Sequence, residues 1–108
     1  MGWFSDDSKQ AQAYNQLQTT EQLHDPSWAH ELIAGAAAFE AAKAYEGHVA
    51  VNGHPPDHAK AKELIAGFTG AFIDREVETR GLDFVDKERA KRQAREQAEA
   101  ALSQQGYY

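Results

Sequence analysis

The 108-residue sequence contains no cysteine, only three prolines and no long apolar run. The absence of cysteine excludes a disulfide framework, a thiol nucleophile and a zinc site made of thiolates. No stretch approaches the roughly 20 apolar residues that a membrane-spanning helix needs. The amino terminus also lacks a basic region followed by an apolar run, so no secretory signal is expected. These absences predict a cytoplasmic protein with no membrane span.

An excess of basic residues is also missing, because the formal net charge is −6. Nucleic acids and anionic membranes are bound through basic surfaces, so neither is expected as the main partner. The hydrophobic fraction of 42% is enough for one small domain, but much of it is alanine. An alanine-rich core buries little area per residue and depends on the close approach of helices. We therefore expect a single domain that self-association would help to stabilise.

Helix-start and helix-stop signals divide the chain into four segments. A helix within residues 1–24 has a thin apolar stripe and is expected to pack weakly. Two long helices over 25–53 and 57–80 are joined by a short turn, which predicts an antiparallel hairpin. A charged last helix is expected over 83–105, with alanines along one seam. The sequence therefore predicts an all-α fold, a small antiparallel helical bundle of three to four helices built on a long helical hairpin.

The boundaries of these helices are marked by local signals. Asp57 is placed to cap the second long helix, and Asn52-Gly53 is placed to end the first. Gly81 is the expected left-handed stop of the second long helix, and either Asp83 or Asp86 starts the last one. The first long helix is apolar nearly all round, so it is expected to lie centrally and to pack on more than one side.

The two long helices share a five-residue repeat. Glu31-Leu32-Ile33-Ala34-Gly35 recurs as residues 63–67, and the caps Asp25 and Asp57 keep the same offset. Either a helical unit was duplicated or the identity arose by chance in an alanine-rich chain. Folding the hairpin about its proline turn places Phe39 opposite Gly70, so that a large ring faces a small residue.

The opening Met1-Gly2-Trp3-Phe4, the run HELIAGAAAFEAAKAYE at 30–46 and the block KELIAGFTGAFIDREVETRGLDFVDKERAKRQA at 62–94 resemble the fungal CipC-like family. These small proteins are named for their induction by the antibiotic concanamycin. The resemblance implies a cytoplasmic stress- or antibiotic-response protein whose biochemical activity is unassigned, with no catalytic residues to carry over. Induction by a drug describes gene regulation and does not show that the protein binds the drug.

Histidines gather around the turn between the long helices. His54, Asp57 and His58 are candidate metal ligands, with His48 as a further one. The alternative is a solvated turn in which Asp57 is only the helix cap. Because spacing across a proline turn is not a recognised zinc pattern, we expect no metal and no cofactor. His24 and His30, beside the other cap, are expected at the surface.

Two groups of charged residues are likewise candidates for either a functional site or a solvated surface. Asp74 and Glu78 lie on one helical face, but Glu76 can pair with Arg80, which favours a salt-bridged, solvated face over acid–base chemistry. The basic side chains of the last helix form either a surface for an acidic partner or a solvated face, and the second is favoured. The residues of that candidate partner surface are Lys87, Lys91, Arg92 and Arg95.

Two functions are therefore open, and an enzyme is not expected because no nucleophile–base pair, phosphate loop or strong metal motif is present. The first is a non-enzymatic interaction or scaffold protein, with a protein partner or self-association as a homodimer. The second is a small hydrophobic-ligand or metal-binding protein, whose pocket Trp28, Phe68 and Phe72 would line. An open cavity among these residues would favour the second function, and a filled core the first. Aromatic residues at the chain ends are expected to dock on the bundle or on a second subunit, namely Trp3, Phe4, Tyr107 and Tyr108.

Overall fold

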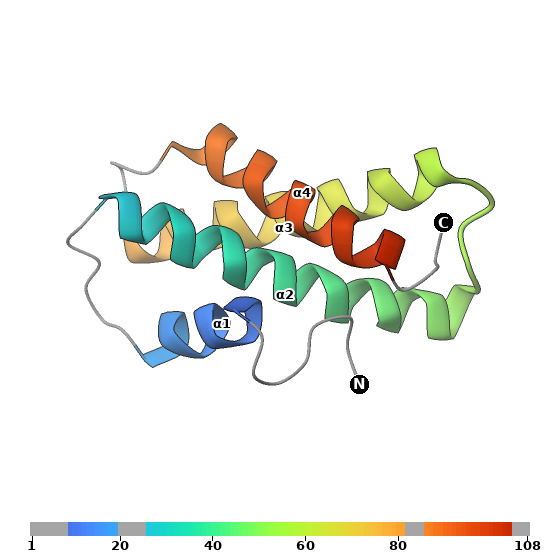
Figure 1. Ribbon diagram of the computed structural model, residues 1–108, viewed down its shortest axis with the longest axis horizontal. Coiled ribbons are helices and arrows are strands. Elements are labelled where there is room, and N and C mark those ends of the chain that lie inside the picture. The colour runs from blue at the N-terminus through green and yellow to red at the C-terminus, as the bar shows by residue number, and fades with distance from the viewer. Residues whose placement is uncertain (1–8, 20–25, 82–85, 105–108) are drawn as a thin grey trace.

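The computed structural model describes residues 9–19, 26–81 and 86–104. They form four helices and, within these ranges, no strand: α1 (Lys9–Thr19), α2 (Pro26–Asn52), α3 (His58–Arg80) and α4 (Lys87–Gln104). Successive helices run antiparallel, and α2 and α3 form the long hairpin (Figure 1). The predicted all-α bundle on a helical hairpin is thus confirmed, with four helices rather than three. The predicted cap at Asp25 lies outside the described residues.

Both ends of α3 are capped as the sequence predicts. The Asp57 side chain accepts a hydrogen bond from the Lys60 backbone N–H at 2.8 Å. At the other end Gly81 adopts a left-handed conformation (φ 66°, ψ 39°) and donates its N–H to the Val77 carbonyl. This backbone conformation costs glycine nothing, whereas a Cβ would strain it. Local sequence therefore sets the length of α3.

The neighbouring helix ends are also set by local contacts. Gly53 has a φ of 81° and donates its N–H to the Val49 carbonyl at 2.8 Å, which ends α2 as predicted. Of the two predicted starts of α4, Asp83 lies outside the described residues. Asp86 caps the helix, since its carboxylate accepts from the Arg89 N–H at 3.1 Å.

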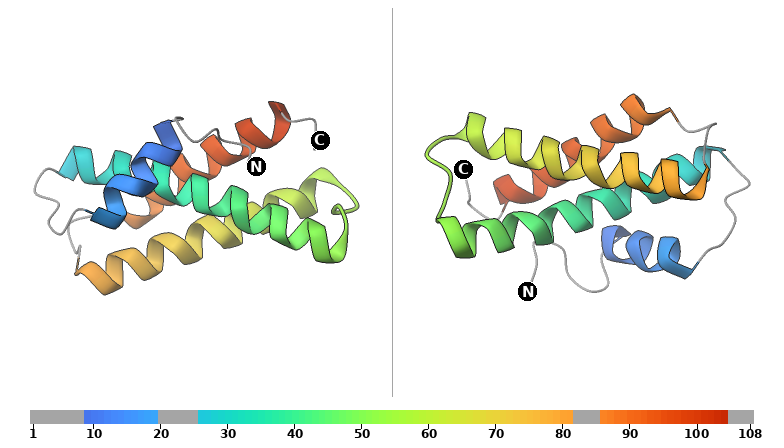
Figure 2. Two further views of the ribbon diagram at one scale, coloured as in Figure 1. Left: turned by 90° about the horizontal axis from the view of Figure 1, so that it is seen from below. Right: turned by 180° about the vertical axis from the view of Figure 1, so that it is seen from behind.

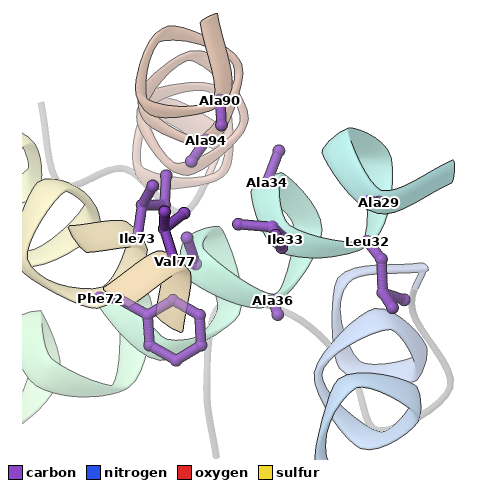
Figure 3. Packing of buried hydrophobic residues seen from close by; sticks show 11 residues of the cluster. Ala29, Leu32, Ile33, Ala34, Ala36, Phe72, Ile73, Val77, Ala90 and Ala94 are labelled. Carbon is purple, nitrogen blue, oxygen red and sulfur yellow. The ribbon is translucent and has the colours of Figure 1, made fainter. Parts of the chain in front are cut away.

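Helix α2 lies at the centre of the bundle and contacts all three other helices, as its apolar character predicts (Figures 1 and 2). Leu32 points toward α1, and Ile33 points toward Ile73 and Val77 of α3 (Figure 3). Thirteen of the 21 buried apolar residues in the described part of the chain are alanines, so the helices pack through close backbone approach rather than through large side chains.

The buried residues form two clusters along the bundle. The first joins α2, α3 and α4 around Ile33, Phe72 and Ile73. The second surrounds Tyr45 and Ile65 near the hairpin turn. Each cluster has a few large side chains set among alanines, which is a common way to interdigitate small and large residues.

The predicted contact of Phe39 with Gly70 is wrong. Phe39 packs instead on Tyr14 of α1, with ring centroids 5.2 Å apart. A Cβ placed on Gly70 would meet the Lys91 side chain of α4 at 3.9 Å. The prediction considered only the two hairpin helices, and it failed because α1 and α4 cover the positions that were expected to face each other.

The two copies of the five-residue repeat occupy different surroundings. A Cβ placed on Gly35 would lie only 2.9 Å from the Ala13 Cβ of α1. The equivalent Gly67 has no such neighbour within 4 Å. Gly35 is therefore a point of close approach between α1 and α2, whereas Gly67 is exposed.

His30 is buried, not at the surface as expected, with only 8% of its area exposed. Its Nε2 accepts a hydrogen bond from the Asp86 backbone N–H at 2.8 Å. Because Nε2 is the acceptor, this nitrogen carries no proton in the bond. The contact joins the N-terminal part of α2 to the start of α4, and the two residues are 56 positions apart in the sequence. Spacing within one helix does not reveal such a partner.

Replacing His30 by leucine is expected to lower the free energy of unfolding by about 1 kcal/mol, since the Asp86 N–H loses its acceptor. His30→Gln is the matched control, because the glutamine carbonyl can reach a position similar to that of Nε2. We expect the glutamine variant to retain more than half of the lost stability in urea titrations followed by circular dichroism. Equal losses in the two variants would show that the hydrogen bond is not what His30 contributes.

Candidate functional site

An open groove crosses one side of α2 between α1 and α4. Its volume is about 580 Å³. Helices α1 and α4 lie on opposite edges of α2, so they form the walls, and α2 forms the floor (Figure 1). We call this feature the glutamine groove. Its lining residues are Lys9, Gln10, Gln12, Ala13, Gln16, Glu31, Leu32, Gly35, Gln93, Glu96 and Gln97.

Two contacts hold the walls of the glutamine groove in place. The close approach of Ala13 to Gly35 fixes α1 against α2. Across the groove, Gln10 Nε2 donates a hydrogen bond to Gln97 Oε1 at 2.9 Å and so joins α1 to α4. Tyr14 adds a ring contact with Phe72 of α3, with centroids 6.4 Å apart. Helix α1 is thus anchored to each of the other helices through a different residue.

The rim of the glutamine groove carries charges of both signs. Lys9 supplies an ammonium group from α1, and Glu31 and Glu96 supply carboxylates from α2 and α4. All three side chains are exposed. The floor is made of Leu32 and Gly35 of α2, and Ala13 of α1 lies beside them. Amide groups therefore dominate the walls, while charges occupy the edges.

The apolar pocket expected from the sequence does not correspond to this groove. Phe72 is 2% exposed and belongs to the first buried cluster, whereas Phe68 is partly buried against the second. The side chain of Trp28 lies outside the described residues. Phe68 and Phe72 therefore pack against different clusters, and the expected pocket stays a prediction.

Of the candidate metal ligands in the histidine-rich turn, only Asp57 has a structural role that the described residues show. Asp57 is the N-cap of α3, and His54 and His58 lie exposed beside it. Over the described part of the chain, no three histidine or acidic side chains come together in a way that could hold a metal ion. His48, the further candidate, lies on α2, and its buried Nδ1 has no hydrogen-bond partner among the residues that the structure describes. His24 lies outside the described residues.

Two of the four basic residues proposed as a partner surface bind the chain itself. Lys91 Nζ lies 3.0 Å from Asp74 Oδ1, and Lys87 Nζ lies 3.7 Å from the same atom. These ion pairs join α3 to α4, and spacing within a single helix does not predict them. Arg92 is exposed and Arg95 is partly exposed.

The acidic face of α3 is paired with basic groups. The predicted bond between Glu76 and Arg80 is confirmed, with Arg80 Nε 2.8 Å from Glu76 Oε1. The hydrogen bond from Lys91 holds the pKa of Asp74 below its ordinary value, and the charges of Lys91 and Lys87 act in the same direction while desolvation opposes them. A carboxylate kept ionised in this way is a structural partner rather than a proton donor.

Folding lowers the pKa of Asp74, so its ion pairs stabilise the protein at pH values above the pKa of the unfolded state. This stabilisation is lost as the pH falls through the lower pKa of the folded state. Asp74→Asn is expected to lower the free energy of unfolding at pH 7 by less than about 1 kcal/mol, since the carboxylate is half exposed. We expect the difference in melting temperature between the variant and the parent to narrow progressively as the pH falls below about 4. A melting-temperature gap that is as wide at pH 3 as at pH 7 would contradict this assignment.

None of the described helices is long and apolar enough to cross a membrane. The terminal aromatic residues lie outside the described ranges, so their expected docking stays a prediction.

The comparisons with known proteins identify the family. Neither the curated proteins nor the solved structures gave a match. The family model described as virulence factor CipC-like matches residues 13–105, which contain most of α1 and all of α2, α3 and α4. The chain therefore belongs to the virulence factor CipC-like family.

Proposed function

We propose that this CipC-like chain is a non-enzymatic binding protein that recognises its partner through the glutamine groove. The observation that carries the proposal is the groove itself, which glutamines of α1 and α4 line above α2. A concave surface with a few polar groups is typical of binding sites. We place this binding in the cytoplasmic stress or antibiotic response that the family resemblance implies. The partner in this proposal is either another protein or a second copy of the chain.

The surroundings of the charged residues support binding without turnover. Asp74 and Glu76 form ion pairs, and Asp57 and Asp86 cap helices. The titratable groups that line the glutamine groove are Lys9, Glu31 and Glu96, and all of them are exposed. Catalytic acids and bases usually need burial or close charged neighbours to shift their pKa values. The groove is therefore better suited to hydrogen bonding than to proton transfer.

The alternative of a hydrophobic ligand between the long helices finds less support. Phe72 is buried within the first cluster, and neither Phe72 nor Phe68 lines the glutamine groove. A ligand at that position would have to separate α2 from its neighbours. Binding at the existing groove requires no such rearrangement.

Site-specific photocrosslinking in living cells tests the proposal. The photoreactive amino acid p-benzoylphenylalanine would replace Gln93 in the groove and, as a matched control, the exposed Glu78 on α3. We expect one recurrent adduct from position 93 that is absent from position 78 and is lost when α1 is displaced. Identical adducts from both positions, or none from position 93, would overturn the proposal.

A further inference from the structure

Helix α3 lies along one edge of the bundle, and its outward side is exposed (Figure 2). The repeat places glycines at equivalent positions of α2 and α3, but only Gly35 is covered by another helix, α1. A Cβ built on Gly67 meets nothing within 4 Å. Gly67 and Ala71 are exposed, and Leu64 and Phe68 beside them are half-buried. We call this surface the outer face of α3, and its residues are Lys60, Leu64, Gly67, Phe68, Ala71 and Glu78.

The outer face has the spacing of a helix that packs along a second helix. Its central line alternates steps of four and three residues, through positions 60, 64, 67, 71, 74 and 78. The middle of this line is apolar and includes two small residues, which allow two backbones to approach closely. Its ends carry opposite charges, with Lys60 in the first turn of α3 and Glu78 in the last. A second copy of the same line is therefore complementary to it when the two helices run in opposite directions.

A twofold axis produces this antiparallel arrangement and repeats every contact. Gly67 then lies opposite Ala71 of the partner subunit, and Lys60 lies opposite Glu78 of the partner subunit. A parallel arrangement would place like charges against each other at both ends, which is unfavourable.

The two charged groups are available for this pairing. Glu78 forms no ion pair within the described part of the chain. The Lys60 ammonium group approaches only Glu63 of its own helix, at 3.8 Å, and 56% of the Lys60 side chain is exposed. An exposed contact of this length is weak, so Lys60 can turn toward a second carboxylate.

We infer that the outer face of α3 binds a second copy of this chain and forms a symmetric, antiparallel homodimer. A single pair of helices with small residues at its centre buries less than the roughly 1,200 Å² of the smallest stable interfaces, so the dimer is weak. None of the residues of the outer face lines the glutamine groove. The inference therefore goes beyond the proposed function and does not depend on it.

Sedimentation equilibrium of the full chain from about 20 µM to about 2 mM tests this inference, since the range covers weak association. We expect the average mass of the parent to rise toward twice that of the monomer. Glu78→Lys sets two lysines against each other at both ends of the interface, and Lys60→Glu sets two carboxylates there. Each variant should lose about 10-fold or more in association constant. Glu88→Lys is the matched control, because Glu88 is an 89% exposed glutamate on α4, away from this face.

Combining the two charge reversals makes the outcome decisive. The double variant Lys60→Glu/Glu78→Lys restores opposite charges and should regain the association of the parent. An equimolar mixture of the two single variants should also associate, although neither does so alone, because each new charge then meets its opposite.

A parent that stays monomeric over the whole concentration range would overturn the inference. Equal association of the parent and both single variants would also overturn it, since the contact would then lie elsewhere. A double variant that stays monomeric would exclude the antiparallel pairing of Lys60 with Glu78. The crosslinking control at position 78 removes the same carboxylate, so it weakens this dimer and remains a suitable control.

Discussion

Replacing Tyr45 by alanine is expected to lower the free energy of unfolding by about 3–5 kcal/mol, the largest effect of any substitution considered. Tyr45 is fully buried and is the largest such side chain in the described part of the chain. The other buried members of its cluster are Ile65, Leu102 and alanines, and Val49, Leu64 and Phe68 are partly buried against it. Alanine has no rotamers with which to refill a cavity, so only the few larger neighbours can move into the space.

Urea denaturation followed by circular dichroism measures this loss. Tyr45→Phe is the matched control, because it keeps the ring and removes only the hydroxyl group, and it should cost about 1 kcal/mol or less. Tyr14→Ala provides a second comparison, since Tyr14 is only partly buried on the first cluster. A Tyr45→Ala variant that unfolds within about 1 kcal/mol of the parent would mean that the second cluster can collapse around the cavity.

Gly35→Ala is expected to displace α1 from α2. The new Cβ would lie 2.9 Å from the Ala13 Cβ, and neither atom belongs to a flexible side chain. Overpacking of this kind costs about 1–3 kcal/mol, which exceeds the gain of about 0.5–1 kcal/mol from replacing a helical glycine with alanine. Because α1 forms one wall of the glutamine groove, the same substitution should abolish binding there.

The repeat supplies the matched control for this variant. Gly67→Ala introduces the same change at the equivalent position of α3, where no atom lies within 4 Å of the new Cβ. It should therefore stabilise the protein by about 0.5–1 kcal/mol. Hydrogen exchange should show faster exchange across α1 in Gly35→Ala and unchanged exchange in Gly67→Ala.

A double variant separates the clash from other effects. Ala13→Gly removes the opposing Cβ, so combining it with Gly35→Ala should restore slow exchange in α1. The pair should then show a favourable coupling energy when compared with the two single variants. Additive effects of the two substitutions would contradict a direct contact between Ala13 and Gly35.

The parts of the fold that were predicted from the sequence are those with local causes. Asp57 and Gly81 act on atoms within four residues of themselves, so neighbouring sequence is enough to recognise them. The apolar character of α2 likewise predicts its central position, because a helix that is apolar nearly all round must be covered on several sides.

The candidate site could not be predicted in the same way. It depends on which side of α2 the polar helix α1 occupies, and a thin apolar stripe does not specify that side. The contact that decides it joins two small residues, Ala13 and Gly35, and small residues in an alanine-rich chain carry no distinctive signal. The burial of His30 was missed for a related reason, since its partner on the chain is 56 residues away.

The alanine-rich interior also affects how this protein can vary. In most cores the harmful substitutions are those that remove atoms, because a cavity results. Along the contact between α2 and α4, residues such as Ala34, Ala94 and Ala98 are already small and fully buried, so nearly every available substitution adds atoms. Mutation at these positions is therefore opposed mainly by lack of space, and glycine and serine are the only replacements close to alanine in size. The interior should diverge slowly, leaving the exposed surfaces as the part of the molecule that is free to change.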